Sequence, residues 1–201
     1  SLPGKLDAAR KSLVGQWHYS PRRVEEINNG WHSTEAKSAE QALRSGDVEA
    51  LINTWENDSY SHYRQEKSVW NLYLLAQLPR EMALTFWLRI NEKKHLFAGE
   101  DYFLSILGLD TLPGLLLAFS HHPKETFPLI LNFGATELAL PVARVWRRFA
   151  AQRDLARQWI LQWPEHTATA LIPLVFTKPS DNSEAALLAL RLLYEQGHGE
   201  L

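Results

Sequence analysis

Apolar residues recur at helical spacing in short segments, roughly 11 to 15 residues apart, that turn-forming residues separate. The pattern is clearest from Gly108 to Leu201, where Asp110, His121-His122-Pro123 and Gly134-Ala135-Thr136 interrupt it. Each segment is too short to be a stable helix alone and too apolar to stand in water, so neighbouring segments have to stack. The pattern therefore predicts an all-α fold of about 10–12 short helices, arranged as a HEAT-like helical repeat, that is, an α-solenoid or α-α superhelix.

We expect one α-helical domain over residues 1–201. Residues 1–30 are predicted to be irregular, residues 31–107 to form helical hairpins, and residues 108–201 to hold the clearest repeats. The last apolar segment, 185–194, is hydrophobic almost all round, whereas a terminal repeat usually carries a polar face. Together with a first residue that is not Met, this predicts a fragment of a longer protein.

Two helix starts can be placed. Asp47 is expected to cap a helix in which Leu51 and Ile52 share one apolar face. Pro79 suits the first position of the next helix, where a missing N–H costs nothing, and Phe86 lies on that helix's apolar side. No run alternates apolar and polar residues over five or more positions, so strand signals are weak throughout.

Composition narrows the class of protein. Of the 201 residues, 45% are hydrophobic and 22% charged, which is typical of a globular protein, and the net charge of -2 gives no general attraction to nucleic acid or acidic lipid. No apolar run approaches ~20 residues, so we expect no membrane span. The chain has no Cys, which excludes disulfides and thiolate metal sites and favours a cytoplasmic location.

The sequence shows no familiar catalytic pattern. It has no Gly-rich phosphate loop, no Gly-x-Ser-x-Gly turn, no His-Glu-x-x-His helix and no metal-spaced Asp run, and its eight His residues are scattered. We therefore expect no cofactor, no metal and no catalytic residues, and a protein that is not an enzyme.

Five arginines lie close together: Arg144, Arg147, Arg148, Arg153 and Arg157, with Asp154 the only carboxylate among them. Arg144 and Arg148 are one helical turn apart, as are Arg153 and Arg157, so each of two helices can show an arginine ridge. One interpretation is a strip that contacts an anion or a nucleic-acid backbone. The other, which we favour, is the polar side of two amphipathic helices whose carboxylate partners come from elsewhere in the fold.

Eight tryptophans divide into two groups. Those on apolar helical stripes, including Trp87, Trp146 and Trp159, are expected to pack in the core. Trp17 and Trp31 flank the irregular first segment instead. They serve either as a lid on the helical stack or as exposed anchors for a partner.

Three stretches carry a resemblance to a known family: Leu78–Met82 continuing through Trp87, Gly108–Leu116, and Phe133–Glu137. They resemble the interior of the large bacterial proteins called molybdate metabolism regulators, and the likeness covers nearly the whole chain as an internal segment. Members of that family carry a WGR-type module near one end and a long central region similar to HEAT-like repeats. No Trp-Gly-Arg tripeptide occurs here, so a nucleic-acid role of that module does not carry over, and the resemblance implies no catalytic residues.

Three functions fit this picture. The first is a non-catalytic interaction scaffold within a larger bacterial regulatory protein, whose partner is another protein or other domains of the parent chain. The second is a nucleic-acid-associated helical repeat that uses the arginine-rich helix pair. The third is an oxyanion-sensing module of the molybdate type, in which helix N-termini and arginines would bind the anion.

Overall fold

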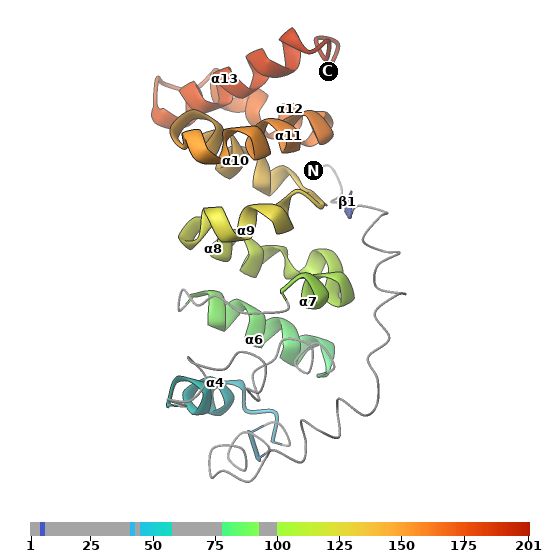
Figure 1. Ribbon diagram of the computed structural model, residues 1–201, viewed down its shortest axis with the longest axis vertical. Helices are drawn as coiled ribbons and strands as arrows, with labels where there is room; N and C mark the ends of the chain where they lie inside the picture. Colours follow the sequence, from blue (N-terminus) through green and yellow to red (C-terminus); the bar gives the residue numbers. More distant parts are fainter. Residues whose placement is uncertain (1–4, 7–40, 43–44, 58–77, 93–99) are drawn as a thin grey trace. The chain divides into compact units, whose positions relative to one another are not determined.

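The computed structural model describes residues 5–6, 41–42, 45–57, 78–92 and 100–201 (Figure 1). Its longer helices are α4 (Val48–Asn57), α6 (Arg80–Glu92), α7 (Glu100–Leu107), α8 (Leu112–His121), α9 (Pro123–Ile130), α10 (Thr136–Arg148), α11 (Arg153–Gln162), α12 (Pro164–Val175) and α13 (Asp181–Glu195). Two 3-10 turns, Gly108–Thr111 and Ala150–Gln152, precede α8 and α11. Helices dominate the described residues, so the all-α prediction is confirmed, while the HEAT-like arrangement stays a prediction.

The chain divides into two compact units. One unit holds β1 (Lys5–Leu6) and the chain from Phe119 to Leu201, and the described residues from Gln41 to Ala118 belong to the other. The border falls inside α8, whereas the sequence pattern changes at Gly108.

In the unit that ends at Ala118, α4 begins as the sequence predicted. The Asp47 carboxylate accepts a hydrogen bond from the Ala50 N–H at 2.9 Å, which satisfies one of the free donors of the first helical turn. Gly46 precedes it with φ +72°, a conformation that glycine adopts without strain. Leu51 and Ile52 are fully buried, so the predicted apolar face is confirmed for these two residues.

Trp87 links α6 to the start of α8 by a hydrogen bond and by close packing. Its indole N–H donates to the Thr111 carbonyl at 2.9 Å, and its ring lies 5.2 Å from the Phe103 ring, centroid to centroid. Gly114, in the first turn of α8, is where this ring rests, because a Cβ there would be 2.3 Å from the indole nitrogen. Only glycine allows the helix backbone and the indole to approach so closely.

An exposed ion pair joins the same two segments. The Arg80 guanidinium pairs with Asp110 in the 3-10 turn and also donates to the Leu107 carbonyl at 2.7 Å. Arg80 is the first residue of α6, directly after Pro79, so the predicted helix start is confirmed within one residue.

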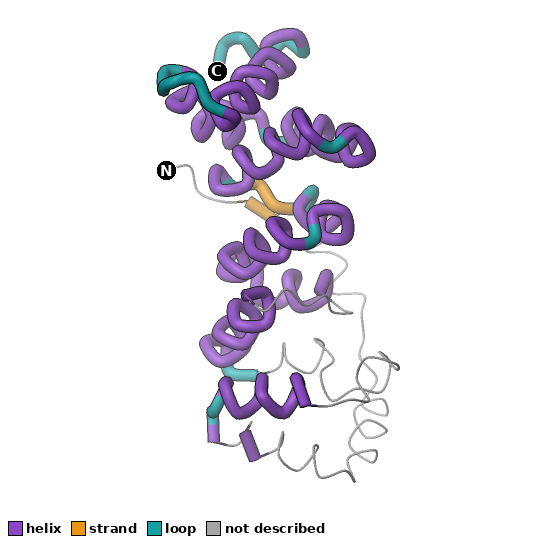
Figure 2. The backbone as a smooth tube through the Cα atoms, turned by 90° about the vertical axis from the view of Figure 1, so that its left-hand side faces the viewer, coloured by secondary structure: helices purple, strands orange, loops and turns teal. Residues whose placement is uncertain are grey.

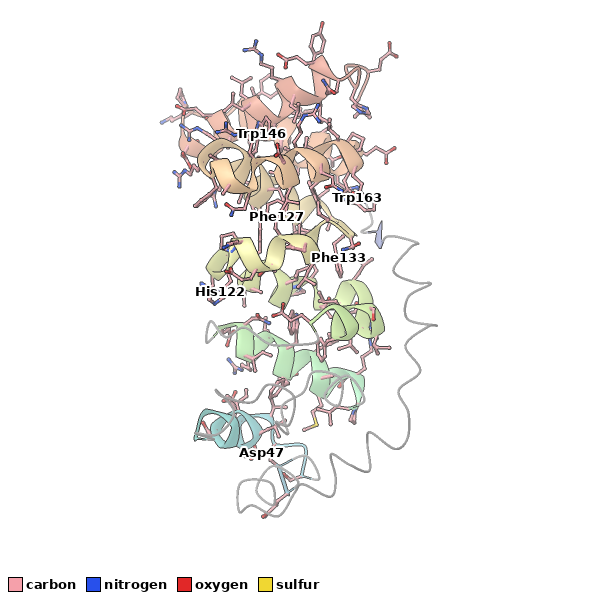
Figure 3. All side chains as sticks on the ribbon, in the orientation of Figure 1. Asp47, His122, Phe127, Phe133, Trp146 and Trp163 are labelled. Atoms are coloured by element: carbon pink, nitrogen blue, oxygen red, sulfur yellow. The ribbon has the colours of Figure 1, made fainter. Side chains whose placement is uncertain are left out.

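A related arrangement recurs in the unit that ends at Leu201. Trp159 in α11 and Trp163, the residue directly after α11, donate their indole N–H groups to the carbonyls of Phe133 and Leu131, at 2.8 and 3.3 Å respectively. Trp163 and Phe133 are labelled in Figure 3. The Trp163 ring lies on Gly134, where a Cβ would meet it at 2.4 Å. Two tryptophans therefore hold the turn that leads from α9 to α10.

That turn also forms the only β-pairing among the described residues. Lys5 pairs with Gly134 and Leu6 with Phe133 in an antiparallel pair of two-residue strands, β1 and β2 (Phe133–Gly134), drawn in orange in Figure 2. No strand was predicted at either site, because the pair is too short to produce an alternating pattern.

Helix α10 is central to this unit and packs against α11, α12 and α13. Its buried side consists of small and branched residues: Leu138, Ala139, Val142, Ala143 and Val145. α13 begins with a reciprocal cap in which the Ser183 N–H donates to the Ser180 hydroxyl at 3.2 Å, and the Ser180 N–H donates to the Ser183 hydroxyl at 2.8 Å. This cap fixes the first turn of α13, the turn to which the arginines of α10 bind.

One helical stretch among the described residues, Phe103–His121, is long and apolar enough to cross a membrane by length and composition. Gly108, with φ +66°, and the 3-10 turn after it separate α7 from α8 within this stretch. Phe103, Leu104 and Leu115 are fully buried in the protein, as in a core helix. The expectation that no segment spans a membrane stays a prediction.

Candidate interaction surfaces

Arg147 is the most enclosed of the five arginines, with 28% of its side chain exposed. It extends from the last turn of α10 to the first turn of α13 and pairs there with Asp181 and Glu184. Guanidinium groups suit such a double contact because their donors form a planar fork. The carboxylates therefore come from α13, as the favoured interpretation of the arginines required.

Arg148 and Arg144 reach the same turn of α13. Arg148 lies 2.6 Å from the Asp181 carboxylate, and Arg144 donates twice to the Asn182 side-chain oxygen, at 2.9 and 2.6 Å. The hydrogen bond from Arg148 is the main reason that the pKa of Asp181 lies below its ordinary value; partial desolvation opposes this shift, and the charges of Arg148 and Arg147 add to it. Asp181 is also the first residue of α13, where the helix dipole favours a negative charge.

The two arginines of α11 make different contacts. Arg157 donates to the Gln196 side chain at 3.0 Å, just after the end of α13, while Arg153 lies 5.9 Å from the centre of the Trp146 ring and donates to the Trp146 carbonyl at 3.3 Å. α13 has 15 residues and is therefore about 22 Å long. The structure thus brings Arg144, Arg147 and Arg148 together at one end of α13 and places Arg157 at the other end.

The predictions for the tryptophans and for metal binding can be compared with the structure in part. Trp87 and Trp159 are buried, as predicted, and Trp146 is half-buried under Arg153. Trp17 and Trp31 lie outside the described residues, so their role as partner anchors stays a prediction. Within the described ranges, no group of three or more His, Asp or Glu residues is arranged to hold a metal ion.

The sequence did not predict a set of exposed apolar side chains on α12, at its C-cap and on α13. We call it the α12–α13 face, and it consists of Ile172 (40% exposed), Phe176 (84%), Leu187 (55%), Leu188 (41%) and Tyr194 (74%). α12 and α13 pack against each other, and both lie within the unit that ends at Leu201 (Figure 1).

The two sides of α13 explain how this face arises. Its buried side is lined mainly by small residues, with Ala185, Ala186 and Ala189 against the rest of the unit. Leu187 and Tyr194 are seven positions apart, hence on one side of the helix, and that side is exposed. A helix with apolar residues on both sides normally has two sides to cover, although the exposed side of α13 also holds the Arg191–Glu195 ion pair. The feature of the sequence that could have predicted these exposed residues is the all-round hydrophobicity of residues 185–194.

The described chain is thus an all-α protein with an exposed apolar face on its last two helices. No protein-family model matches the sequence, and no solved structure matches it. The chain is 90% identical over 200 residues to a protein of Escherichia coli strain K12 that bears the name "Uncharacterized protein YehI". The match covers all of this chain but only 16% of that relative.

Proposed function

We propose that the chain is a non-catalytic helical interaction scaffold, part of a large regulatory protein of the kind that the sequence resembles, and that its α12–α13 face is the docking surface. The observation that carries the proposal is the concentration of exposed large apolar side chains on these two helices. Of the eight such residues among the described positions, six lie in the last 30 residues of the chain: Ile172, Phe176, Leu187, Leu188, Tyr194 and Leu201.

The physical reason is the cost of leaving this surface in water. A large apolar side chain carries roughly 200 Å² of surface, so the five residues of the face expose on the order of 500 Å² together. Monomeric proteins rarely expose apolar patches larger than a few hundred Å², and larger patches commonly mark interaction sites. Covering it needs no conformational change in the unit, since the side chains already stand on the surface of packed helices.

Photo-crosslinking tests the proposal. The relative YehI, with its matching segment replaced by this chain, would be produced in E. coli with a photoreactive phenylalanine at Phe176 or at Tyr194. We expect cross-links from both positions to another protein or to another part of the same polypeptide. We expect none from Gln158, an exposed residue of α11 outside the face. If neither Phe176 nor Tyr194 gave more cross-linked product than Gln158, the face would not be a docking surface and the proposal would be wrong.

A further inference from the structure

The pairing of β1 with β2 is a feature of the unit that ends at Leu201 that the proposed docking surface does not use (Figure 2). We propose that β2 is the edge of a strand-acceptor site, which binds an extended peptide segment through backbone hydrogen bonds. Lys5–Leu6 fills this site within the chain and is separable from it, so a peptide of the same sequence binds there in its place. This mode of binding adds a strand to an existing edge.

The acceptor edge is held in place by contacts that do not involve β1. The Trp159 indole N–H donates to the Phe133 carbonyl at 2.8 Å, and the Trp163 indole N–H donates to the Leu131 carbonyl at 3.3 Å. The Trp163 ring also rests against Gly134, at the position that a Cβ would fill. β2 is therefore fixed by α11 and by the two helices that it joins. An edge fixed in advance has little conformational freedom left to lose when a segment pairs with it.

No local turn holds β1 against β2. The two strands lie about 128 positions apart in the sequence, whereas the loop of a β-hairpin has about 2–5 residues. The described residues between them, from Gln41 to Ala118, belong to the other unit. The pairing is therefore an association of two distant segments of one chain. Its strength depends on the site itself and on the effective concentration of the tethered segment.

The backbone determines which kind of segment the site accepts. Adjacent positions in an antiparallel pair alternate between residues that exchange N–H···O=C bonds and residues that do not. Since Lys5 is opposite Gly134 and Leu6 is opposite Phe133, one of these two pairs exchanges such bonds. The ligand is thus an extended peptide with free backbone N–H groups at both positions, and proline at these positions is excluded.

Hydrogen exchange measured by mass spectrometry tests the site in the full 201-residue chain. Lys5→Pro combined with Leu6→Pro empties the site, because proline has no N–H to donate. We expect amide exchange to rise about tenfold or more in a fragment that includes Phe133 and Gly134, and to stay unchanged in residues 185–193 of α13. Lys5→Thr combined with Leu6→Val is the matched control, which keeps both N–H groups and suits a strand, and it should leave both fragments unchanged.

A peptide added to the double proline variant then tests whether the segment is separable. The probe is the sequence of residues 1–7, Ser-Leu-Pro-Gly-Lys-Leu-Asp, at about 1 mM, which is the range of effective concentration for a tethered segment. We expect it to return the exchange of the β2 fragment to within about twofold of the unmodified chain. The same peptide with N-methyl groups on the backbone nitrogens of its Lys and Leu should have no effect, because these nitrogens no longer donate.

Four results would overturn the inference. Unchanged exchange in the double proline variant would show that β1 does not occupy β2. If the peptide failed to restore protection, the pairing would be a fixed part of the fold and not a binding site; should α13 also lose protection in the variant, the peptide has to restore both fragments. Equal restoration by the N-methylated peptide would exclude strand addition. A dimer mass in light scattering, with protection that falls on dilution, would show that a second copy supplies the strand.

Discussion

Gly114→Ala tests the contact between α6 and α8 in the most direct way. The new Cβ would lie 2.3 Å from the indole nitrogen of Trp87 and 2.4 Å from its Cδ1 atom, far inside van der Waals contact. Trp87 cannot turn away freely, because it is 1% exposed and packs on Phe103. The indole or the first turn of α8 therefore has to shift, and either movement weakens the hydrogen bond to the Thr111 carbonyl.

The size of the effect follows from three contributions. Overpacking of a core costs about 1–3 kcal/mol, and leaving the buried indole N–H without its acceptor costs about 1–3 kcal/mol more. The better helix propensity of Ala returns at most about 1 kcal/mol. We expect a net loss of roughly 2–4 kcal/mol in the free energy of unfolding, which corresponds to a fall in Tm of about 5–15 °C for a chain of this size.

The assay is urea or thermal unfolding followed by circular dichroism at the helix band. Gly199→Ala is the matched control, because its Cβ would meet only the exposed Tyr194 ring, at 3.0 Å, and we expect it to be nearly neutral. Trp87→Phe removes the indole nitrogen, so in that background Gly114→Ala should cost at least about 1.5 kcal/mol less. Equal or greater stability of Gly114→Ala, or the same cost in both backgrounds, would refute the close contact.

Further predictions concern the unit that ends at Leu201. Gly134→Ala should cost less than Gly114→Ala in the same assay, about 1–2 kcal/mol, because the indole on it is partly exposed and can turn aside. The pKa of Asp181 is lowered mainly by Arg148, so the stabilisation that Asp181 provides is complete above its unfolded pKa, near 3.8, and is lost as pH falls below that value. Asp181→Asn should therefore lower Tm at pH 7 and flatten the decline of Tm between pH 4 and pH 2. Arg147→Ala should lower stability by about 1 kcal/mol because two carboxylates lose a partner, whereas Arg153→Ala at an exposed position should change it by less than about 0.5 kcal/mol.

Local features of the fold were predictable because their causes lie within a few residues. The cap at Asp47 depends on a carboxylate and an N–H three positions away, and the breaks at His122 and Ala135 depend on a following Pro or a short polar turn. Helical periodicity alone identified Phe86 as a core residue. The all-α class follows from the sum of such local signals.

Pairings over long distances in the sequence could not be predicted in the same way. β1 and β2 have two residues each and lie about 128 positions apart in the sequence, so no periodic pattern predicts that they pair. Trp87 contacts Gly114, which lies 27 positions later in the chain. Each residue alone has a local explanation, so the sequence does not indicate that the two meet. The carboxylates that meet Arg147 were expected, but the sequence did not identify α13 as their source.

The contacts of the arginines also bear on the choice between a nucleic-acid surface and a protein surface. Each phosphate contact contributes about 0.9 to the slope of log affinity against log salt. A contact contributes in this way when the cation that makes it has no fixed ion-pair partner in the protein. Arg147 and Arg148 already hold Asp181 and Glu184, so binding a phosphate would exchange one ion pair for another and leave a carboxylate beside the ligand. Three arginines remain, at separate places on α10 and α11, and they set an upper limit of about 3 for that slope. The exposed apolar side chains of α12 and α13, by contrast, give up only water when a partner covers them. On this comparison an apolar surface gains more from binding than the arginines do, which is why the proposed docking surface lies on α12 and α13 and not on the arginines.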